Sequence, residues 1–268
     1  MRRRCFSRCA ALAAVATLFL PVATSAAARA RPFPRFYLRT CARSDFLSSG
    51  TRVRAELCHA TKDAAAGRAV VVLHGCGGFS TFDHRLAGDL PQMGIATLYI
   101  DFFAPTPPPG NRGFCGVRRT TFSHRDIFTR WQHVVLDAAA SLRRTPNINP
   151  RRVGVVGWSL GGGLAVATAA AAELPGSSRR PFAAVVGFST GGDLRRQPAV
   201  RLPPLLLLSG GTTDAIPLVA TEALYRSARA AGDQVELFVY PHGVHDWRGR
   251  QGRVGIRRAV AFLTTQMH

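Results

Sequence analysis

Residues 153–163 read Val153-Gly154-Val155-Val156-Gly157-Trp158-Ser159-Leu160-Gly161-Gly162-Gly163, an apolar run that breaks abruptly into glycines around one serine. The β-branched start has the length of a buried parallel strand. Residues 164–172 are rich in alanine and favour a helix. Ser159 therefore stands at a sharp turn from strand to helix, where the flanking glycines lack the Cβ atoms that would collide. In this setting the sequence Gly-x-Ser-x-Gly predicts a nucleophile elbow.

The rest of the chain alternates between apolar runs of strand length and segments of helical character. We expect strands at 69–73, 96–100, 152–156, 183–187, 205–208 and 235–240, with two weaker strands at 37–41 and 52–58. Helices are expected at 127–144, 164–174, 217–231 and 255–266. This alternation predicts the α/β class, with a mostly parallel, twisted sheet covered by helices on both faces. Functional sites in such sheets form at the carboxyl ends of the strands.

Two of these strand ends carry partners that a nucleophilic serine would need. The motif Gly-x-Ser-x-Gly can arise by chance in a chain with 26 glycines, so a catalytic serine needs support from an acid and a base elsewhere in the sequence. Asp214 ends a polar loop after one strand and is our candidate to orient a histidine; Asp193 is the alternative acid, and Asp214 could instead cap a helix. After the last strand, His245 is our candidate for the general base and His242 the alternative.

A glycine-rich turn, His74-Gly75-Cys76-Gly77-Gly78, follows the first long apolar strand. We expect the backbone N–H groups of Cys76 and Leu160 to form an oxyanion hole, and His74 to be structural. An ordinary tight turn is one alternative. A buried thiol at Cys76, close to the site, is another.

The first residues are typical of an export signal. A basic start precedes an apolar stretch at 10–22, and small residues at 26–28 offer a cleavage site. The apolar stretch is short for a membrane span, although a retained anchor is the alternative. We therefore expect a signal peptide at 1–28 and one domain at 29–268. The mature protein would be periplasmic or secreted, with no stable membrane insertion.

The formal net charge is +20, carried almost entirely by arginine. The arginines are scattered in ones and twos without aromatic interleaving, so we expect no nucleic-acid partner. No Cys/His spacing resembles a metal site, and we expect neither a metal nor a cofactor.

Cleavage of the signal would reduce the six cysteines to four, which allow three pairings. A Cys41–Cys58 bridge across an N-terminal hairpin is plausible, and Cys76 could then pair with Cys115.

With these residues assembled, the chain resembles the α/β-hydrolase superfamily and, within it, the dienelactone hydrolase family. The resemblance runs from about residue 69 to the C-terminus and is carried by the motifs at 73–78, 101–103, 157–162 and 240–247. It implies the chain order Ser159, Asp214, His245 for the triad. The family's histidine is followed two places later by an aromatic residue, as His245 is by Trp247. One difference is that the founding members use cysteine as the nucleophile, where this chain has Ser159.

The residues and the resemblance together predict an exported serine hydrolase that cleaves small-molecule carboxylic esters or lactones through an acyl-enzyme on Ser159. The loop at 104–120 is expected either to bind a substrate carboxylate, through Arg112, Arg118 and Arg119, or to be a solvated surface loop. One alternative function is a peptidase of the prolyl-oligopeptidase type, which usually carries an added domain. The other is a non-catalytic binding protein that kept the α/β-hydrolase fold.

Overall fold

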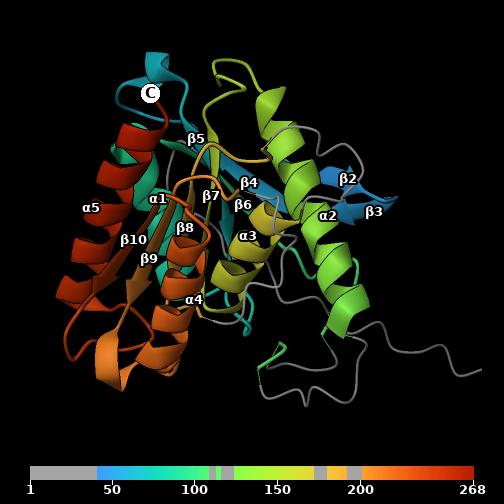
Figure 1. Cartoon of the computed structure of the whole chain (residues 1–268). Coiled ribbons are helices and arrows are strands. Elements are labelled where there is room, and N and C mark those ends of the chain that lie inside the picture. Colours follow the sequence, from blue (N-terminus) through green and yellow to red (C-terminus); the bar gives the residue numbers. More distant parts are fainter. Residues whose placement is uncertain (1–40, 109–112, 116–123, 172–179, 192–200) are drawn as a thin grey trace, which may run out of the picture. The chain divides into compact units, whose positions relative to one another are not determined.

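A mostly parallel sheet forms the centre of the protein (Figure 1). The computed structural model describes residues 41–108, 113–115, 124–171, 180–191 and 201–268, which all belong to one compact unit, Arg31–His268. The expected signal at 1–28, and most of the expected strand at 37–41, lie outside these residues. Within the described part of the chain, no helix is long and apolar enough to cross a membrane.

In the part of the chain that the structure describes, eight strands form the main sheet, in the order β1-β4-β6-β5-β7-β8-β9-β10. Pairing is parallel from β6 to β10, whereas β4 pairs antiparallel with β6 and with β1. This confirms the mostly parallel sheet predicted from the sequence. The strands are β1 (Cys41–Arg43), β4 (Ala55–Cys58), β5 (Ala69–Leu73), β6 (Ala96–Ile100), β7 (Val153–Trp158), β8 (Val185–Phe188), β9 (Leu205–Ser209) and β10 (Val235–Val239).

Helices cover both faces of this sheet, as predicted (Figure 1). On one face lie α2 (His124–Arg143), α3 (Leu160–Ala170) and α4 (Leu218–Ala230). On the other lie α1 (Thr81–Gln92) and α5 (Gly249–Gln266). Successive residues of a strand point to opposite faces, so each central strand feeds both cores. In β5, for example, Val71 packs on the α2 side and Val70 on the α1 side.

Helix α1 is an element that the sequence analysis missed. Gly88 and Pro91 lie inside it and both disfavour helix, which concealed its pattern. Its start does carry a readable signal. Ser80 accepts a hydrogen bond from the backbone N–H of Asp83, and the Asp83 carboxylate accepts one from the backbone N–H of Ser80. This reciprocal capping box stabilises the first turn of the helix.

The N-terminal part forms the expected hairpin. Strands β2 (Phe46–Ser48) and β3 (Thr51–Val53) pair antiparallel around Ser49 and Gly50, which both have positive φ, at 48° and 79°. Two such residues make the tight turn that matches strand twist. Further out, Cys41 of β1 lies opposite Cys58 of β4, and the two form a disulfide. Of the pairings that the sequence left open, the structure contains Cys41–Cys58 and Cys76–Cys115.

We predict that Glu56→Gln stabilises the protein at alkaline pH. Burial raises the pKa of this β4 carboxyl to about 7, and its buried Oε2 has no hydrogen-bond partner among the described residues. A raised acid pKa disfavours the ionised form, so stability is lost as pH rises through about 7. Because the side chain is only half buried, we expect a gain of about 1 kcal/mol in the free energy of unfolding above about pH 8, and none near pH 4.

Urea unfolding at both pH values measures this effect. Glu236→Gln is the matched control, since Glu236 is exposed on the edge strand β10. If Glu56→Gln raised the free energy of unfolding equally at both pH values, the buried charge of Glu56 would not be the cause.

Candidate active site

Ser159 occupies the junction between β7 and α3 in a strained backbone conformation. Its φ and ψ are 55° and −118°, a combination that residues other than glycine rarely adopt. The close approach around it explains the glycines. A Cβ on Gly157 would lie 2.2 Å from the carbonyl oxygen of Gly161, and a Cβ on Gly161 would lie 2.4 Å from that of His74. The predicted turn from strand to helix is therefore present, with no room for larger residues.

The structure brings Ser159, His245 and Asp214 together in one line of hydrogen bonds. His245 Nε2 lies 3.0 Å from Ser159 Oγ, and His245 Nδ1 lies 2.7 Å from Asp214 Oδ1. A carboxylate only accepts hydrogen bonds, so Nδ1 carries the proton and Nε2 is free to accept the serine O–H. His242 is exposed on the neighbouring turn. Among the described residues, it forms no hydrogen bond with Ser159 or Asp214.

Asp214 is held as a carboxylate although its side chain is fully buried. Burial by itself raises the pKa of Asp214, but hydrogen bonds from His245, Ser189 and the backbone N–H groups of Ile216 and Gly210 outweigh it and hold the pKa below its ordinary value. The ionised form is the one that can orient and stabilise an imidazolium.

Behind the acid lies a polar contact that the sequence analysis missed. The Trp247 indole N–H donates to Ser189 Oγ over 2.7 Å, and the Ser189 hydroxyl donates to Asp214 Oδ2. Both residues are fully buried. The aromatic residue two places after His245 thus supports the acid through Ser189. The available signal was a serine two residues after the predicted strand 183–187, at the carboxyl edge of the sheet.

The turn at 74–78 lies directly against the elbow. A Cβ on Gly75 would lie 2.6 Å from the Trp158 ring. Cys76 is bonded to Cys115, so the interpretation of Cys76 as a thiol is wrong. Leu160 is the first residue of α3, where a backbone N–H has no intrahelical acceptor. Both N–H groups expected in the oxyanion hole therefore belong to segments that border Ser159.

His74 is buried in an aromatic environment. Its ring stacks on Phe102, with the ring centroids 4.1 Å apart, and its Nδ1 lies 2.9 Å from the Gly75 carbonyl oxygen. These contacts fit the structural role expected for it.

Several sequence candidates lie outside the described residues. These are the alternative acid Asp193 and the loop arginines Arg112, Arg118 and Arg119. Within the described residues, no group of three His, Cys, Asp or Glu side chains could hold a metal ion.

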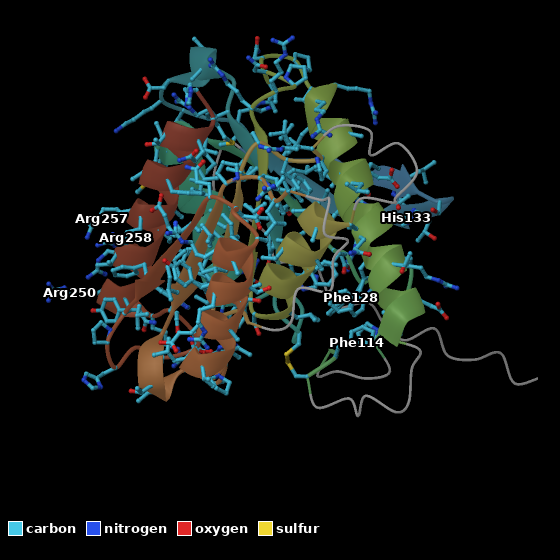
Figure 2. All side chains as sticks on the ribbon, viewed as in Figure 1. Phe114, Phe128, His133, Arg250, Arg257 and Arg258 are labelled. Carbon is cyan, nitrogen blue, oxygen red and sulfur yellow. A yellow bond between two sulfur atoms is a disulfide. The ribbon has the colours of Figure 1, made fainter. Side chains whose placement is uncertain are left out.

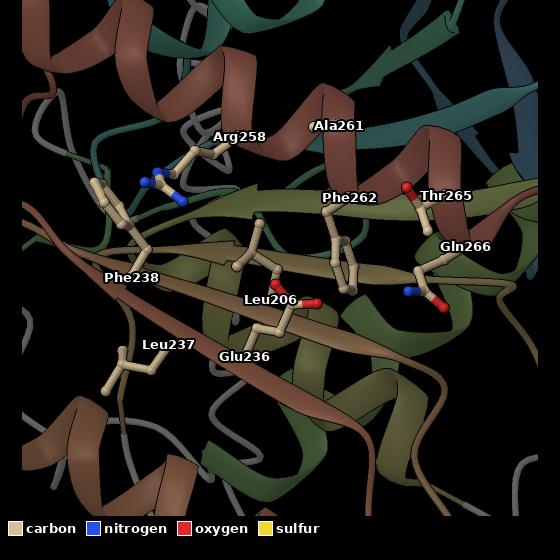
Figure 3. A pocket seen from close by; sticks show the side chains of 9 residues that line it. All are labelled: Leu206, Glu236, Leu237, Phe238, Arg258, Ala261, Phe262, Thr265 and Gln266. Carbon is tan, nitrogen blue, oxygen red and sulfur yellow. The ribbon is translucent and has the colours of Figure 1, made fainter.

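A separate hollow of about 280 Å³ lies between α5 and β10, at the edge of the sheet (Figure 3). The Arg258 guanidinium lies 3.9 Å from the centroid of the Phe238 ring at its rim. None of the described residues that line this hollow belongs to the triad, so it is a site separate from the triad.

Comparisons with known proteins bear on the family and the fold of this chain. The model of the dienelactone hydrolase family matches residues 56–262. A solved dienelactone hydrolase-like promiscuous phosphotriesterase from metagenomic libraries is 15% identical, with a TM-score of 0.68 over 85% of this chain and 99% of that one. The dienelactone hydrolase of Anabaena variabilis is 21% identical, with a TM-score of 0.65 over 85% and 100% of the two chains.

A third solved structure is an esterase. Thermogutta terrifontis esterase 2, phosphorylated by paraoxon, is 18% identical, with a TM-score of 0.64 over 88% of this chain and 97% of that one. At such identities these likenesses show the fold, which is the α/β-hydrolase fold. The chain matches no curated protein sequence.

The elbow geometry predicts that alanine at two nearby glycines, Gly161 and Gly163, affects the stability of the fold differently. Gly161→Ala should destabilise the fold by about 2 kcal/mol or more, because its Cβ would meet the His74 carbonyl oxygen, which is backbone and cannot move aside. Gly163→Ala is the matched control. Its Cβ would lie 3.4 Å from Thr190 Oγ1, and alanine favours helix by about 1 kcal/mol, so we expect no loss of stability. Thermal unfolding compares the two, and equal melting temperatures would contradict the packing argument.

Proposed function

Because the chain belongs to the dienelactone hydrolase family, we propose that it is an exported serine hydrolase that cleaves small carboxylic esters or lactones through an acyl-enzyme on Ser159. The observation that carries this proposal is the hydrogen-bond line from Ser159 through His245 to Asp214. A serine hydroxyl needs such a base, because its own pKa is too high to give useful alkoxide near neutral pH.

In the first half of the reaction, His245 Nε2 removes the proton from Ser159 Oγ as the oxygen attacks the ester carbonyl carbon. Asp214 keeps the imidazole in the required tautomer and stabilises the imidazolium that forms. The tetrahedral intermediate then collapses. His245 gives its proton to the leaving alcohol, and the acyl group remains on Ser159.

The negative charge of the intermediate falls on the former carbonyl oxygen. We assign its stabilisation to the backbone N–H groups of Cys76 and Leu160. The position of Leu160 at the start of α3 supports this, since free N–H groups and the helix dipole both favour negative charge there. Loss of one such donor costs about 3 kcal/mol of transition-state stabilisation in comparable sites.

In the second half, His245 takes a proton from water, which attacks the acyl-enzyme and releases the acid. The reaction uses this chain's own residues and needs no cofactor. One likeness bears on the chemistry of the nucleophile, because Thermogutta terrifontis esterase 2 is phosphorylated by paraoxon. We therefore propose that organophosphates react with Ser159 in the same way.

Export is the second part of the proposal. The basic, apolar and small-residue order of residues 1–28 supports removal of a signal peptide and a periplasmic or secreted enzyme. Sequencing the N-terminus of the protein released from cells tests this. A start at residue 29 is expected. Full-length chain recovered in the membrane fraction would favour a retained anchor instead.

Ser159→Ala should abolish ester turnover, with a loss of about 10⁴-fold or more in kcat and little change in melting temperature. A fluorophosphonate probe should label the unsubstituted protein, and peptide mapping should place the label on Ser159. Turnover that survives in the variant would rule out the acyl-enzyme. Folded protein that neither labels nor turns over any ester would favour the binding-protein alternative.

The two neighbouring histidines should behave differently. His245→Gln should lower kcat by about 10⁴-fold or more, because it removes the base that is hydrogen-bonded to Ser159. His242→Gln is the matched control, since His242 lies on the same turn but is exposed. Steady-state kinetics on one activated ester measures both variants. Equal losses would mean that the observed hydrogen bond does not identify the base.

A further inference from the structure

The segment Gly113–Cys115, which we call the clamp, is fastened to the turn at 74–78 by three contacts. Cys115 forms a disulfide with Cys76, with the two Cα atoms 5.0 Å apart. The Phe114 backbone N–H donates to the Cys76 carbonyl oxygen over 2.7 Å. Gly113 lies so close that a Cβ there would be 2.2 Å from the same oxygen. The side chain and the carbonyl of Cys76 are therefore both fixed by the clamp.

The clamp is itself anchored in the protein core. The Phe114 ring packs edge to face on Phe103 and on Trp131, with centroids 4.7 Å and 4.9 Å apart. Phe114 lies beside the first turns of α2, where Phe128 is also found (Figure 2). Since Phe103 and Trp131 are buried, these contacts tie the clamp to the α2 side of the sheet.

On its other side, the same turn lies against the elbow. The close approaches of Gly75 to Trp158, and of Gly161 to the His74 carbonyl, leave the turn no room to shift toward Ser159. Inside the turn, the Gly78 N–H donates to the Gly75 carbonyl over 3.1 Å. Cys76 is thus held between the elbow and the clamp, and the orientation of its own N–H follows from these two supports.

We propose that Cys115 is a positioning residue. Through its disulfide, it holds the backbone N–H of Cys76 in the orientation that the oxyanion needs. The inference rests on the proposed function, because it gives the clamp a role in that same reaction. Cys115 contacts no reacting atom, so its effect passes entirely through Cys76. A donor that is aimed at the transition state, and only weakly at the substrate, changes kcat and leaves KM nearly unchanged.

The chain offers a matched control in its second disulfide. Cys41–Cys58 joins β1 to β4 at the opposite edge of the described sheet from β10 and has no contact with the elbow. The test compares Cys76→Ser with Cys115→Ser in one chain against Cys41→Ser with Cys58→Ser in another. The backbone N–H at position 76 remains in both.

In the first double variant, we expect kcat to fall about tenfold to a hundredfold, with KM within about twofold of the unsubstituted protein. The affinity for a boronic acid, which forms a tetrahedral adduct on the serine, should fall by the same factor. In the control, we expect kcat to stay within about twofold even if the melting temperature drops. Unchanged kcat in the first double variant, or equal losses in both, would overturn the proposal.

A measurement on the unsubstituted protein covers the case in which the first double variant does not fold. Cys115 is exposed, whereas Cys58 is fully buried, so a dithiol should open the Cys76–Cys115 bond first. The dithiol closes to a cyclic disulfide as its two electrons and two protons pass to Cys76 and Cys115. Alkylation with iodoacetamide and peptide mapping follow the opening. We expect kcat to fall in step with alkylation of this pair, and unchanged kcat after full alkylation would contradict the proposal.

Failure of this inference differs from failure of the proposed function. If Ser159→Ala abolishes turnover but the Cys76/Cys115 variant keeps full kcat, only the role of the clamp is wrong. If Ser159→Ala retains turnover, the acyl-enzyme itself is wrong, whatever the cysteine variants do.

Discussion

The backbone of Ser159 is the constraint on which the site depends. Positive φ at a serine costs about 1–3 kcal/mol and persists only where the surroundings hold it. Here β7 pairs with β5 on one side and β8 on the other, and α3 starts at the next residue. These parallel pairings fix the end of the strand, and the glycines at 157 and 161 let the helix approach it. The sheet thereby stabilises a conformation that the isolated turn would not keep.

Once the backbone of Ser159 is fixed, the charge of Asp214 decides whether His245 can act as the base for the serine. A buried carboxylate is costly unless hydrogen bonds satisfy it. Asp214 accepts hydrogen bonds from two backbone N–H groups, from Ser189 and from His245. These contacts come from the ends of β8 and β9 and from the loop after β10, so three strands contribute to the state of a single group. The same bonds that hold the pKa of Asp214 low also set the direction in which His245 faces.

The two disulfides act on different parts of the protein. Cys41–Cys58 joins the antiparallel strands β1 and β4 at one edge of the sheet, and β10 lies at the opposite edge. Cys76–Cys115 joins the turn beside the elbow to a segment anchored by aromatic packing. If the clamp has the role proposed for it, precision at the oxyanion hole is set partly by a covalent bond and partly by the core under α2. The glycine-rich turn alone has too little side-chain packing to provide it.

The sequence by itself determined the α/β class and the strand-to-helix turn at Ser159, because these depend on local periodicity. The rule that sites form at strand ends narrowed the acid to Asp214 or Asp193 and the base to His245 or His242, and the family resemblance then favoured His245. The sequence analysis missed α1, whose Gly88 and Pro91 oppose helix locally but are tolerated in the packed structure. The sequence offered both disulfides among three possible pairings, and the tertiary structure decided between them. Only the tertiary structure showed the support of Asp214 by Ser189 and Trp247. This support joins residues far apart in the chain, and such contacts are set by how the strands are ordered in the sheet, which no local pattern records.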